Sequence, residues 1–101
     1  MSDKVSLHIV SVEGPKFNLG HLVATPNAMN ALPPDEMLVA VGRHVRGDWG
    51  ELDLEDHGAN ERALLHGGRL FSQYHSTAQV KFWIITECDR SATTVLLPED
   101  Y

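Results

Sequence analysis

His44 and Asp48 are the two residues of this sequence whose types and spacing best suit acid–base chemistry. On a continuous helix, residues four apart share one face, so the carboxylate could orient and charge the imidazole. A histidine held in this way can act as a general base. Gly47 lies between the two residues and could end the helix before Asp48. The alternative is a simple ion pair, or a histidine that faces solvent.

A second group of polar side chains lies near the C-terminus, where Glu87, Asp89 and Arg90 fall in one predicted turn. Arg90 could bind a carboxylate or a phosphate through its forked N–H donors. In a hydrolase, these residues would support His44 as the base. The alternative is a charged hairpin turn whose side chains hydrogen-bond to nearby backbone. We assign Glu87, Asp89 and Arg90 as candidate binding residues.

Trp49 stands between Gly47 and Gly50 and is a third candidate for binding. Tryptophan is enriched at interaction hot spots, so an exposed Trp49 would be an anchor for a partner. In the competing interpretation the ring folds onto the core and fixes the linker between two helices. The glycines would then supply the positive φ angles that a tight passage needs.

Six carboxylates lie between residues 48 and 61. A dense acidic surface can imitate DNA and so act as a decoy for a DNA-binding protein. The commoner explanation is a solvated helix start, where carboxylates favour the exposed amide donors of the first turn.

No pattern in the sequence predicts a metal or a cofactor. The six histidines show no H-x-x-x-H spacing, and the single cysteine cannot form the C-x-x-C pair of a zinc site. Gly67 and Gly68 follow a predicted helix, so they suit a helix end and not a phosphate cradle. We therefore expect no cofactor and no metal, and on balance we expect that the protein is not an enzyme.

The charge balance and the cysteine content narrow the partners and the location. Lys and Arg total 8 against 14 Asp and Glu, which gives a net charge of −6 at pH 7. Nucleic-acid binders usually carry a basic surface, so the sequence argues against a nucleic-acid partner. Cys88 is the only cysteine, which predicts a reducing, cytoplasmic location. We expect no membrane segment and no signal peptide, and a protein partner of unknown identity stays open.

Capping residues and apolar spacing predict three helices. Thr25 followed by Pro26 predicts the start of a short helix over residues 26–32. A second helix follows and ends at Gly47. Its apolar face is formed by Met37, Leu38, Val41 and Val45. A third helix begins after Asp53 as its N-cap. Its thin apolar side is formed by Ala59, Ala63 and Leu64.

Alternating apolar residues predict strands at both ends of the chain. Near the start, they predict a strand over residues 5–9, and Leu22 with Val23 suits a second, short one. The last third of the chain predicts three strands over residues 69–75, 80–86 and 93–97. The connections between these three are short enough for antiparallel hairpins. The middle strand is apolar on both sides, as a central strand usually is.

These elements predict one α+β domain over residues 17–101. Its core is a small antiparallel sheet, formed by the C-terminal three-stranded meander with or without an N-terminal strand. Two or three helices pack against this sheet. Residues 1–16 are expected to form a variable N-terminal strand or extension.

Four phrases of the sequence form a wider pattern. They are "LGHLVAT" at 19–25, "HVRGDWG" at 44–50, "RLFSQY" at 69–74 and "WIITECDRSATTVLLPEDY" at 83–101. Together they resemble a family of small bacterial proteins, labelled plasmid-related or hypothetical, that occur on plasmids, phages and other mobile elements. Cys88 stands where the family pattern has alanine, which argues against a catalytic thiol. The resemblance implies no particular activity, substrate or cofactor.

We therefore expect a cytoplasmic accessory or interaction protein, derived from a mobile element and without catalysis. One alternative is a small hydrolase or nuclease that uses His44 with the turn at residues 87–90. The other alternative is an acidic decoy of a DNA-binding protein.

Overall fold

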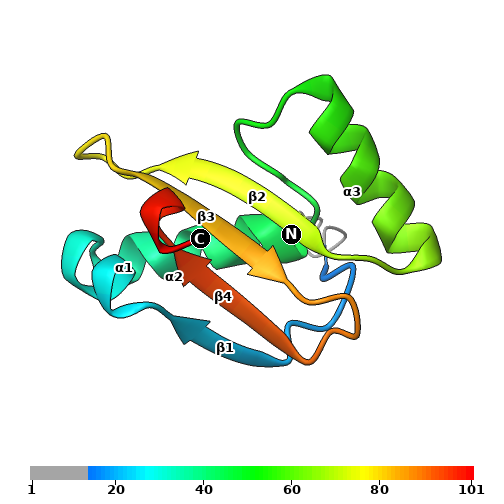
Figure 1. Ribbon diagram of the computed structural model, residues 1–101, viewed down its shortest axis with the longest axis horizontal. Helices are drawn as coiled ribbons and strands as arrows, with labels where there is room; N and C mark the ends of the chain where they lie inside the picture. Colours follow the sequence, from blue (N-terminus) through cyan, green and yellow to red (C-terminus); the bar gives the residue numbers. More distant parts are fainter. Residues whose placement is uncertain (1–13) are drawn as a thin grey trace, which may run out of the picture.

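The computed structural model describes residues 14–101 and arranges them as one sheet with three helices (Figure 1). The elements in chain order are β1 (His21–Ala24), α1 (Pro26–Ala31), α2 (Pro34–Val45), α3 (Leu54–His66), β2 (Leu70–His75), β3 (Lys81–Thr86), β4 (Ala92–Leu96) and a 3-10 turn, η2 (Pro98–Asp100). The predicted α+β class is confirmed. The strand predicted over residues 5–9 lies outside the described residues. Within residues 14–101, no helix is long and apolar enough to cross a membrane.

The four strands lie in the order β1-β4-β3-β2, so β3 and β4 are the inner strands. The strands β2, β3 and β4 form the predicted antiparallel meander, and the central place of β3 is confirmed. The fourth strand, β1, pairs in parallel with β4 and sets His21 beside Ala92. The sheet is therefore mixed, where the sequence predicts an antiparallel one. Three helices separate β1 from the meander in the chain, so the pairing of β1 is a long-range contact that local patterns do not encode.

The helix ends follow the predicted capping chemistry. The Thr25 hydroxyl accepts the amide N–H of Ala28 at 3.1 Å, and Pro26 is the first residue of α1. The Asp53 carboxylate caps α3 by accepting the amide of Asp56 at 2.8 Å. Gly47 follows α2 with a φ of 82°, a left-handed angle that favours glycine.

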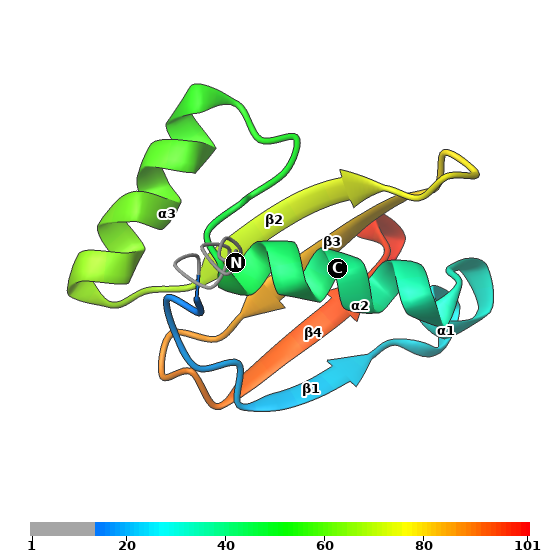
Figure 2. The same ribbon diagram turned by 180° about the vertical axis from the view of Figure 1, so that it is seen from behind.

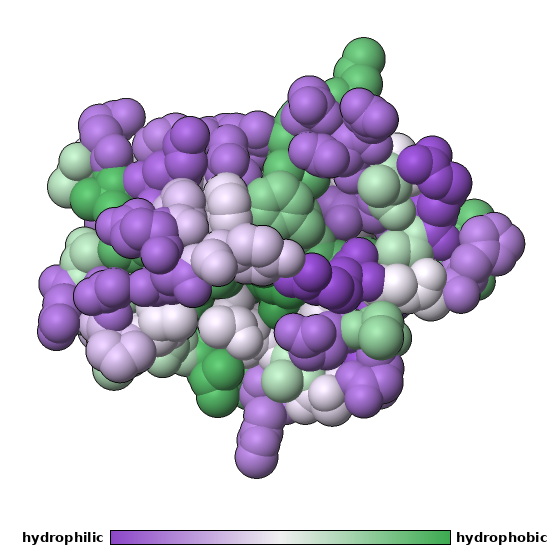
Figure 3. Space-filling model, viewed as in Figure 1, coloured by the Kyte–Doolittle hydropathy of each residue, from purple (hydrophilic) through white to green (hydrophobic). Residues whose placement is uncertain are grey.

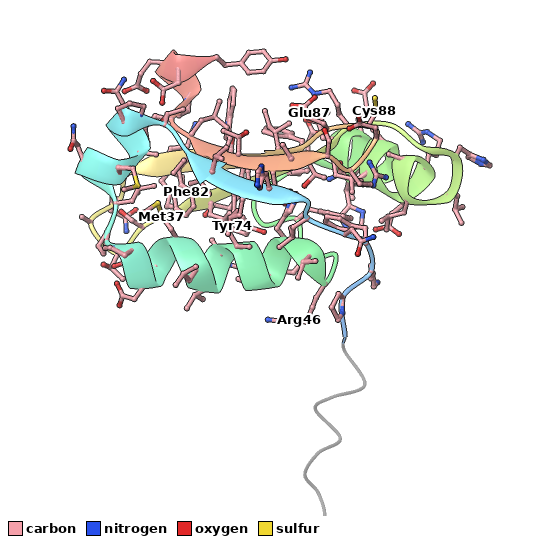
Figure 4. All side chains as sticks on the ribbon, turned by 90° about the horizontal axis from the view of Figure 1, so that it is seen from below. Met37, Arg46, Tyr74, Phe82, Glu87 and Cys88 are labelled. Carbon is pink, nitrogen blue, oxygen red and sulfur yellow. The ribbon has the colours of Figure 1, made fainter. Side chains whose placement is uncertain are left out.

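The helix α2 covers one face of the sheet and forms the main core with it (Figure 2). The side of α2 that faces the sheet consists of Met37, Ala40, Val41 and His44. Figure 4 shows Met37, Tyr74 and Phe82 in the layer between α2 and the sheet. Leu38, which the spacing predicts on this apolar face, is 63% exposed. Successive residues of a helix lie about 100° apart, so Leu38 follows Met37 out of the contact.

The helix α3 lies beside β2 rather than over the sheet (Figures 1 and 2). Its Ala63 is buried, whereas Ala59, predicted on the same side, is exposed. Asn60 is buried and clasps β2: its Nδ2 donates to the Phe71 carbonyl at 2.6 Å, and its Oδ1 accepts the Phe71 amide at 3.0 Å. Residues 49–51 bond further along the same edge of β2. The outer edge of β2 is therefore covered.

The C-terminal turn η2 lies on the face of the sheet opposite α2 (Figure 4). The Asp100 carboxylate accepts hydrogen bonds from Thr25 Oγ1 at 2.6 Å and from Asn27 Nδ2 at 2.7 Å. The hydrogen bond from Thr25 is the main reason that the pKa of Asp100 is lowered. These contacts fasten Tyr101 beside Trp83. No helix of the described residues covers the rest of this face.

Two glycines with similar positive φ angles give a test of the packing beside β2. Gly50 has a φ of 75°, and a Cβ added there would overlap the carbonyl oxygen of Gln73. Gly67 has a φ of 85°, and a Cβ there would meet no atom within 4 Å. We expect Gly67→Ala to lower the free energy of unfolding by about 1–2 kcal/mol, because a φ of 85° with a ψ of 154° strains any side chain even in open space. Gly50→Ala should cost at least twice as much, measured by urea unfolding. Equal losses would contradict this packing.

Candidate functional site

His44, the predicted base, is fully buried between α2 and the sheet and uses both ring nitrogens. Its Nδ1 lies 2.6 Å from Ser72 Oγ, and its Nε2 lies 2.9 Å from Thr86 Oγ1. Thr86 Oγ1 lies 2.7 Å from Thr93 Oγ1. The Thr93 hydroxyl donates to the Leu19 carbonyl at 2.7 Å. This buried polar chain joins α2 to β2, β3, β4 and the segment before β1.

Which group donates in the hydrogen bonds between His44 and Leu19 follows from the Leu19 carbonyl at the end of the buried polar chain. A carbonyl only accepts, so the single hydroxyl hydrogen of Thr93 is committed to Leu19. Thr86 must then donate to Thr93, and has no hydrogen left for His44. His44 therefore carries a hydrogen on Nε2 and donates to Thr86. In the neutral ring that burial favours, Nδ1 is bare and the Ser72 hydroxyl donates to it. Each group of the chain is satisfied with the imidazole neutral.

The surroundings of His44 keep it neutral. Burial lowers the pKa of His44 to about 4. The rings of Phe17 and Trp49 lie edge-on to the imidazole, with centroids 5.3 and 5.6 Å away. A general base must lie within hydrogen-bond reach of a substrate proton. With both nitrogens bonded and no exposed surface, this geometry gives no support to His44 as a base.

Asp48, the predicted partner of His44, pairs with Arg43 instead. The Nε and Nη2 atoms of Arg43 lie 2.7 and 3.2 Å from the two carboxylate oxygens. The hydrogen bond from Arg43 lowers the pKa of Asp48. Because α2 ends before Gly47, the four-residue spacing no longer places Asp48 on the face of His44. The structure does not bring these two residues together.

Trp49 lies in the core with 1% of its surface exposed. Its Nε1–H donates to the Glu61 carboxylate of α3 at 2.8 Å, and its ring stacks on Phe17 at 6.3 Å between centroids. Of the two arrangements considered for Trp49, the structure shows the one in which the buried ring fixes the linker between two helices. An anchor for a partner would need the ring to be exposed.

Arg90, the candidate anion binder, donates hydrogen bonds to backbone carbonyls. Its Nη1 donates to the Gly68 carbonyl at 2.6 Å, and its Nη2 donates to the Ala63 carbonyl at 3.1 Å. The guanidinium also lies 5.8 Å from the ring centroid of Phe17. A cation at the C-terminal end of a helix is favoured by the helix dipole. Arg90 thus connects the end of α3 to the turn between β3 and β4.

The two acids near Arg90 serve the same turn. The Asp89 carboxylate accepts the amide N–H of Ser91 at 3.0 Å, and its hydrogen bonds with Ser91 lower its pKa. Glu87 is half-buried and carries the turn's backbone bonds with Ala92 and Arg90. Glu87, Asp89 and Arg90 therefore form a braced hairpin turn in the structure, as in the alternative interpretation of this segment.

The acidic run at residues 48–61 is also engaged inside the fold. Besides Asp48 with Arg43, Glu51 pairs with His75 at 2.5 Å, Asp53 caps α3 and Glu61 accepts from Trp49. The remaining two acids, Glu55 and Asp56, lie in the first turn of α3. A helix N-terminus favours negative charge there. These local partners account for the acidic run without a DNA-like surface.

The sheet face opposite α2 carries an open groove of about 320 Å³. We call its lining the aromatic face, which consists of Arg69, Phe71, Trp83, Ile85 and Tyr101. Figure 3 shows this side of the molecule, where green and pale surface lies among purple hydrophilic residues. Ligand sites in proteins are typically concave and mostly apolar, with a few polar groups.

The rings of the aromatic face are held by contacts with one another. Phe71 and Trp83 meet edge to face with centroids 5.1 Å apart, and Trp83 and Tyr101 meet at 5.8 Å. Such edge-to-face pairs are favoured by the charge distribution of the rings. The Trp83 Nε1–H donates to Gln73 Oε1 at 3.0 Å, which orients the indole. These contacts fix the relative orientations of the rings on the aromatic face.

Arg69 is the cation of the aromatic face. Its Nη1 donates to the Tyr101 hydroxyl at 2.8 Å, and its guanidinium carbon lies 5.4 Å from the centroid of that ring. The Tyr101 contact raises the pKa of Arg69. Among residues 14–101, no carboxylate forms an ion pair with Arg69. Its remaining N–H donors can therefore meet an anionic group in the groove.

The sequence carries one signal for this face, in the apolar residues on both sides of β3. Phe82 and Ile84 face α2, and Trp83 and Ile85 face the opposite side. Such a strand predicts cover on both faces. Among residues 14–101, only one face is covered by an α-helix, because α3 lies beside β2 (Figure 1). The apolar residues on the second side of β3 therefore point to the aromatic face. The sites predicted from the sequence do not include this face, because they were sought among charged residues in turns.

No family model matches this sequence, and no curated protein or solved structure is significantly similar to it. The likeness to plasmid-related proteins stays a prediction from the residues. The candidate site therefore rests on the geometry of the described residues.

Removing one hydroxyl from the buried polar chain should cost more than removing one from the other face of the sheet. Thr86→Val leaves the His44 Nε2–H without an acceptor and Thr93 without a donor. We expect the free energy of unfolding to fall by about 2 kcal/mol. Thr94→Val is the matched control on the opposite face of β4 and should change it by less than about 0.5 kcal/mol. Equal losses in urea unfolding would contradict the chain.

The buried imidazole predicts a dependence of stability on pH. The pKa of His44 is about 4 in the folded protein against 6.5 for an ordinary histidine, so the unfolded state binds the proton more readily. The contribution is complete above pH 6.5 and is lost as the pH falls towards 4. Between about pH 6 and pH 4.5, the free energy of unfolding should drop by at most about 1.4 kcal/mol per pH unit.

Two substitutions separate His44 from the other histidines in this test. His44→Gln should remove most of the slope between pH 6.5 and pH 5. His57→Gln, at an exposed position of α3, should keep it. The four carboxyls whose pKa values are lowered act mainly below pH 5, so the window from pH 6.5 to pH 5 reports mostly histidine; they are Glu36, Asp48, Asp89 and Asp100. A flat profile in the unaltered protein would contradict the neutral, buried His44.

Proposed function

We propose that this protein is a non-catalytic interaction protein that binds its partner through the aromatic face. The observation that carries the proposal is an apolar groove with one arginine that pairs with no carboxylate of residues 14–101, on a sheet face that no α-helix of those residues covers. Tryptophan, tyrosine and arginine are the residues most enriched at the energetic centres of interfaces. A protein from the same mobile element or from its host cytoplasm would suit the resemblance.

The chemistry of the groove selects the kind of partner. Phe71, Trp83 and Ile85 offer apolar surface, so the partner should insert an apolar side chain. Arg69 lies at the margin with free donors, so a carboxylate should stand beside that side chain. We therefore propose a protein segment with an apolar residue next to an acidic one.

The two alternatives receive less support from the geometry. The hydrolase would need His44 at a surface, and it is buried with both nitrogens bonded. The DNA decoy would need free carboxylates, and those of residues 48–61 mostly have partners. A nucleic-acid partner would need several cations, and the aromatic face offers one.

The two tryptophans allow the proposal to be tested with an internal control. The ¹⁵N-labelled protein is titrated with short peptides in which leucine stands beside glutamate. The control peptides have lysine in place of the glutamate. We expect the indole N–H resonance of Trp83 to move with the glutamate peptides, whereas that of the buried Trp49 stays in place. Arg69→Gln should weaken this binding about tenfold, the equivalent of one charge-assisted hydrogen bond.

Two results would contradict the proposed function. In the first, no peptide moves the Trp83 resonance. In the second, the glutamate and lysine peptides bind equally well, so that Arg69 selects nothing. A shift of both indole resonances together would point to a change of the whole fold instead of binding at the aromatic face.

A further inference from the structure

The strand β1 has one bonded edge, and its other edge has no strand partner among residues 14–101; we call this second edge the free edge. The amides of His21 and Thr25 donate to the carbonyls of Ser91 and Val95 at 2.9 and 3.0 Å. In a parallel ladder, alternate residues bond to the same neighbour, so the N–H and C=O groups between these point the other way. In β1 these groups belong to Leu22 and Ala24. Figure 1 shows β1 at the margin of the sheet, with no described element along its outer side.

Exposed apolar side chains surround this free edge. Leu22 and Val23 are 42% and 48% exposed, and Met29 and Leu38 are 61% and 63% exposed. Leu22, Met29 and Leu38 line a groove of about 260 Å³ between β1 and α2, with Val41 at its base. The other edge of the sheet, at β2, is not open to a partner strand, because Asn60 and residues 49–51 already bond to it.

The segment around β1 is also free of charge. Residues 17–34 contain no Asp, Glu, Lys or Arg, although the whole chain carries 22 of them and a net charge of −6. Proteins usually protect an exposed edge strand with charged side chains. Two copies of an acidic chain repel each other over most of their surfaces. At β1 they can approach without that repulsion, which favours a second copy over a strongly charged partner.

We propose that β1 is a homodimer interface, in which the edges of two copies pair antiparallel about a two-fold axis. Leu22 of one copy would face Ala24 of the other, a register that uses all four outward groups of each strand. Val23 would then face its own counterpart across the axis. The two four-stranded sheets would join into one sheet of eight strands. The two α2 helices would lie on the same side and cover Leu22, Met29 and Leu38.

The mass of the full chain in solution tests the interface, measured by sedimentation equilibrium over a series of concentrations. We expect a dimer in the unaltered protein and a monomer in Val23→Lys, which sets two like charges directly opposite each other across the axis. Leu65→Lys, at an 80% exposed position of α3, should remain a dimer. Circular dichroism establishes that both variants are folded.

A disulfide test of the register does not depend on the folding of Val23→Lys. In a Cys88→Ser background, Val23→Cys should form a covalent dimer on mild oxidation, because facing residues in such a pair have close Cβ atoms. Leu65→Cys in the same background should not cross-link at a comparable rate. A monomeric unaltered protein at all concentrations would overturn the proposal. So would a dimer that survives Val23→Lys, or equal cross-linking of the two cysteine variants. None of these results depends on the aromatic face.

Discussion

The buried polar chain is the interaction on which the rest of this structure depends. His44, Ser72, Thr86 and Thr93 join α2 to the three strands of the meander, with one hydrogen for each contact. A polar group buried without a partner costs more than a hydrogen bond contributes, so the four side chains must keep their relative positions. The position of α2 across the sheet and the register of β3 on β4 are therefore fixed together. The imidazole therefore has a structural role in the core.

Much of the local structure can be predicted from single residues. Thr25, Asp53 and Gly47 mark helix boundaries because their chemistry acts within a few residues. The meander follows from alternation and short connections in the same way. The pairing of β1 with β4 and the lateral place of α3 depend on contacts between distant parts of the chain. Asn60 exemplifies this, since its partner Phe71 belongs to another element.

The candidate site was less accessible to sequence reasoning, for a physical reason. His44, Arg90 and Trp49 are residue types that catalyse or bind when exposed, and each is used inside the fold. Their partners are hydroxyls and carbonyls from other elements, which no spacing reveals. The aromatic face is made of ordinary strand residues such as Phe71 and Trp83. It is a candidate site because the α-helices of the described residues cover only the other side of the sheet.

The main-chain oxygen of residue 19 has a consequence for how this core can vary. The proton order of the whole chain is set by the acceptor that ends it, and that acceptor belongs to the peptide backbone. Any amino acid at this position would supply the same oxygen, so the histidine tautomer does not depend on which residue stands there. Drift in sequence at residue 19 can therefore leave the tautomer untouched. Substituting side chains one by one would not remove the backbone oxygen that fixes the tautomer.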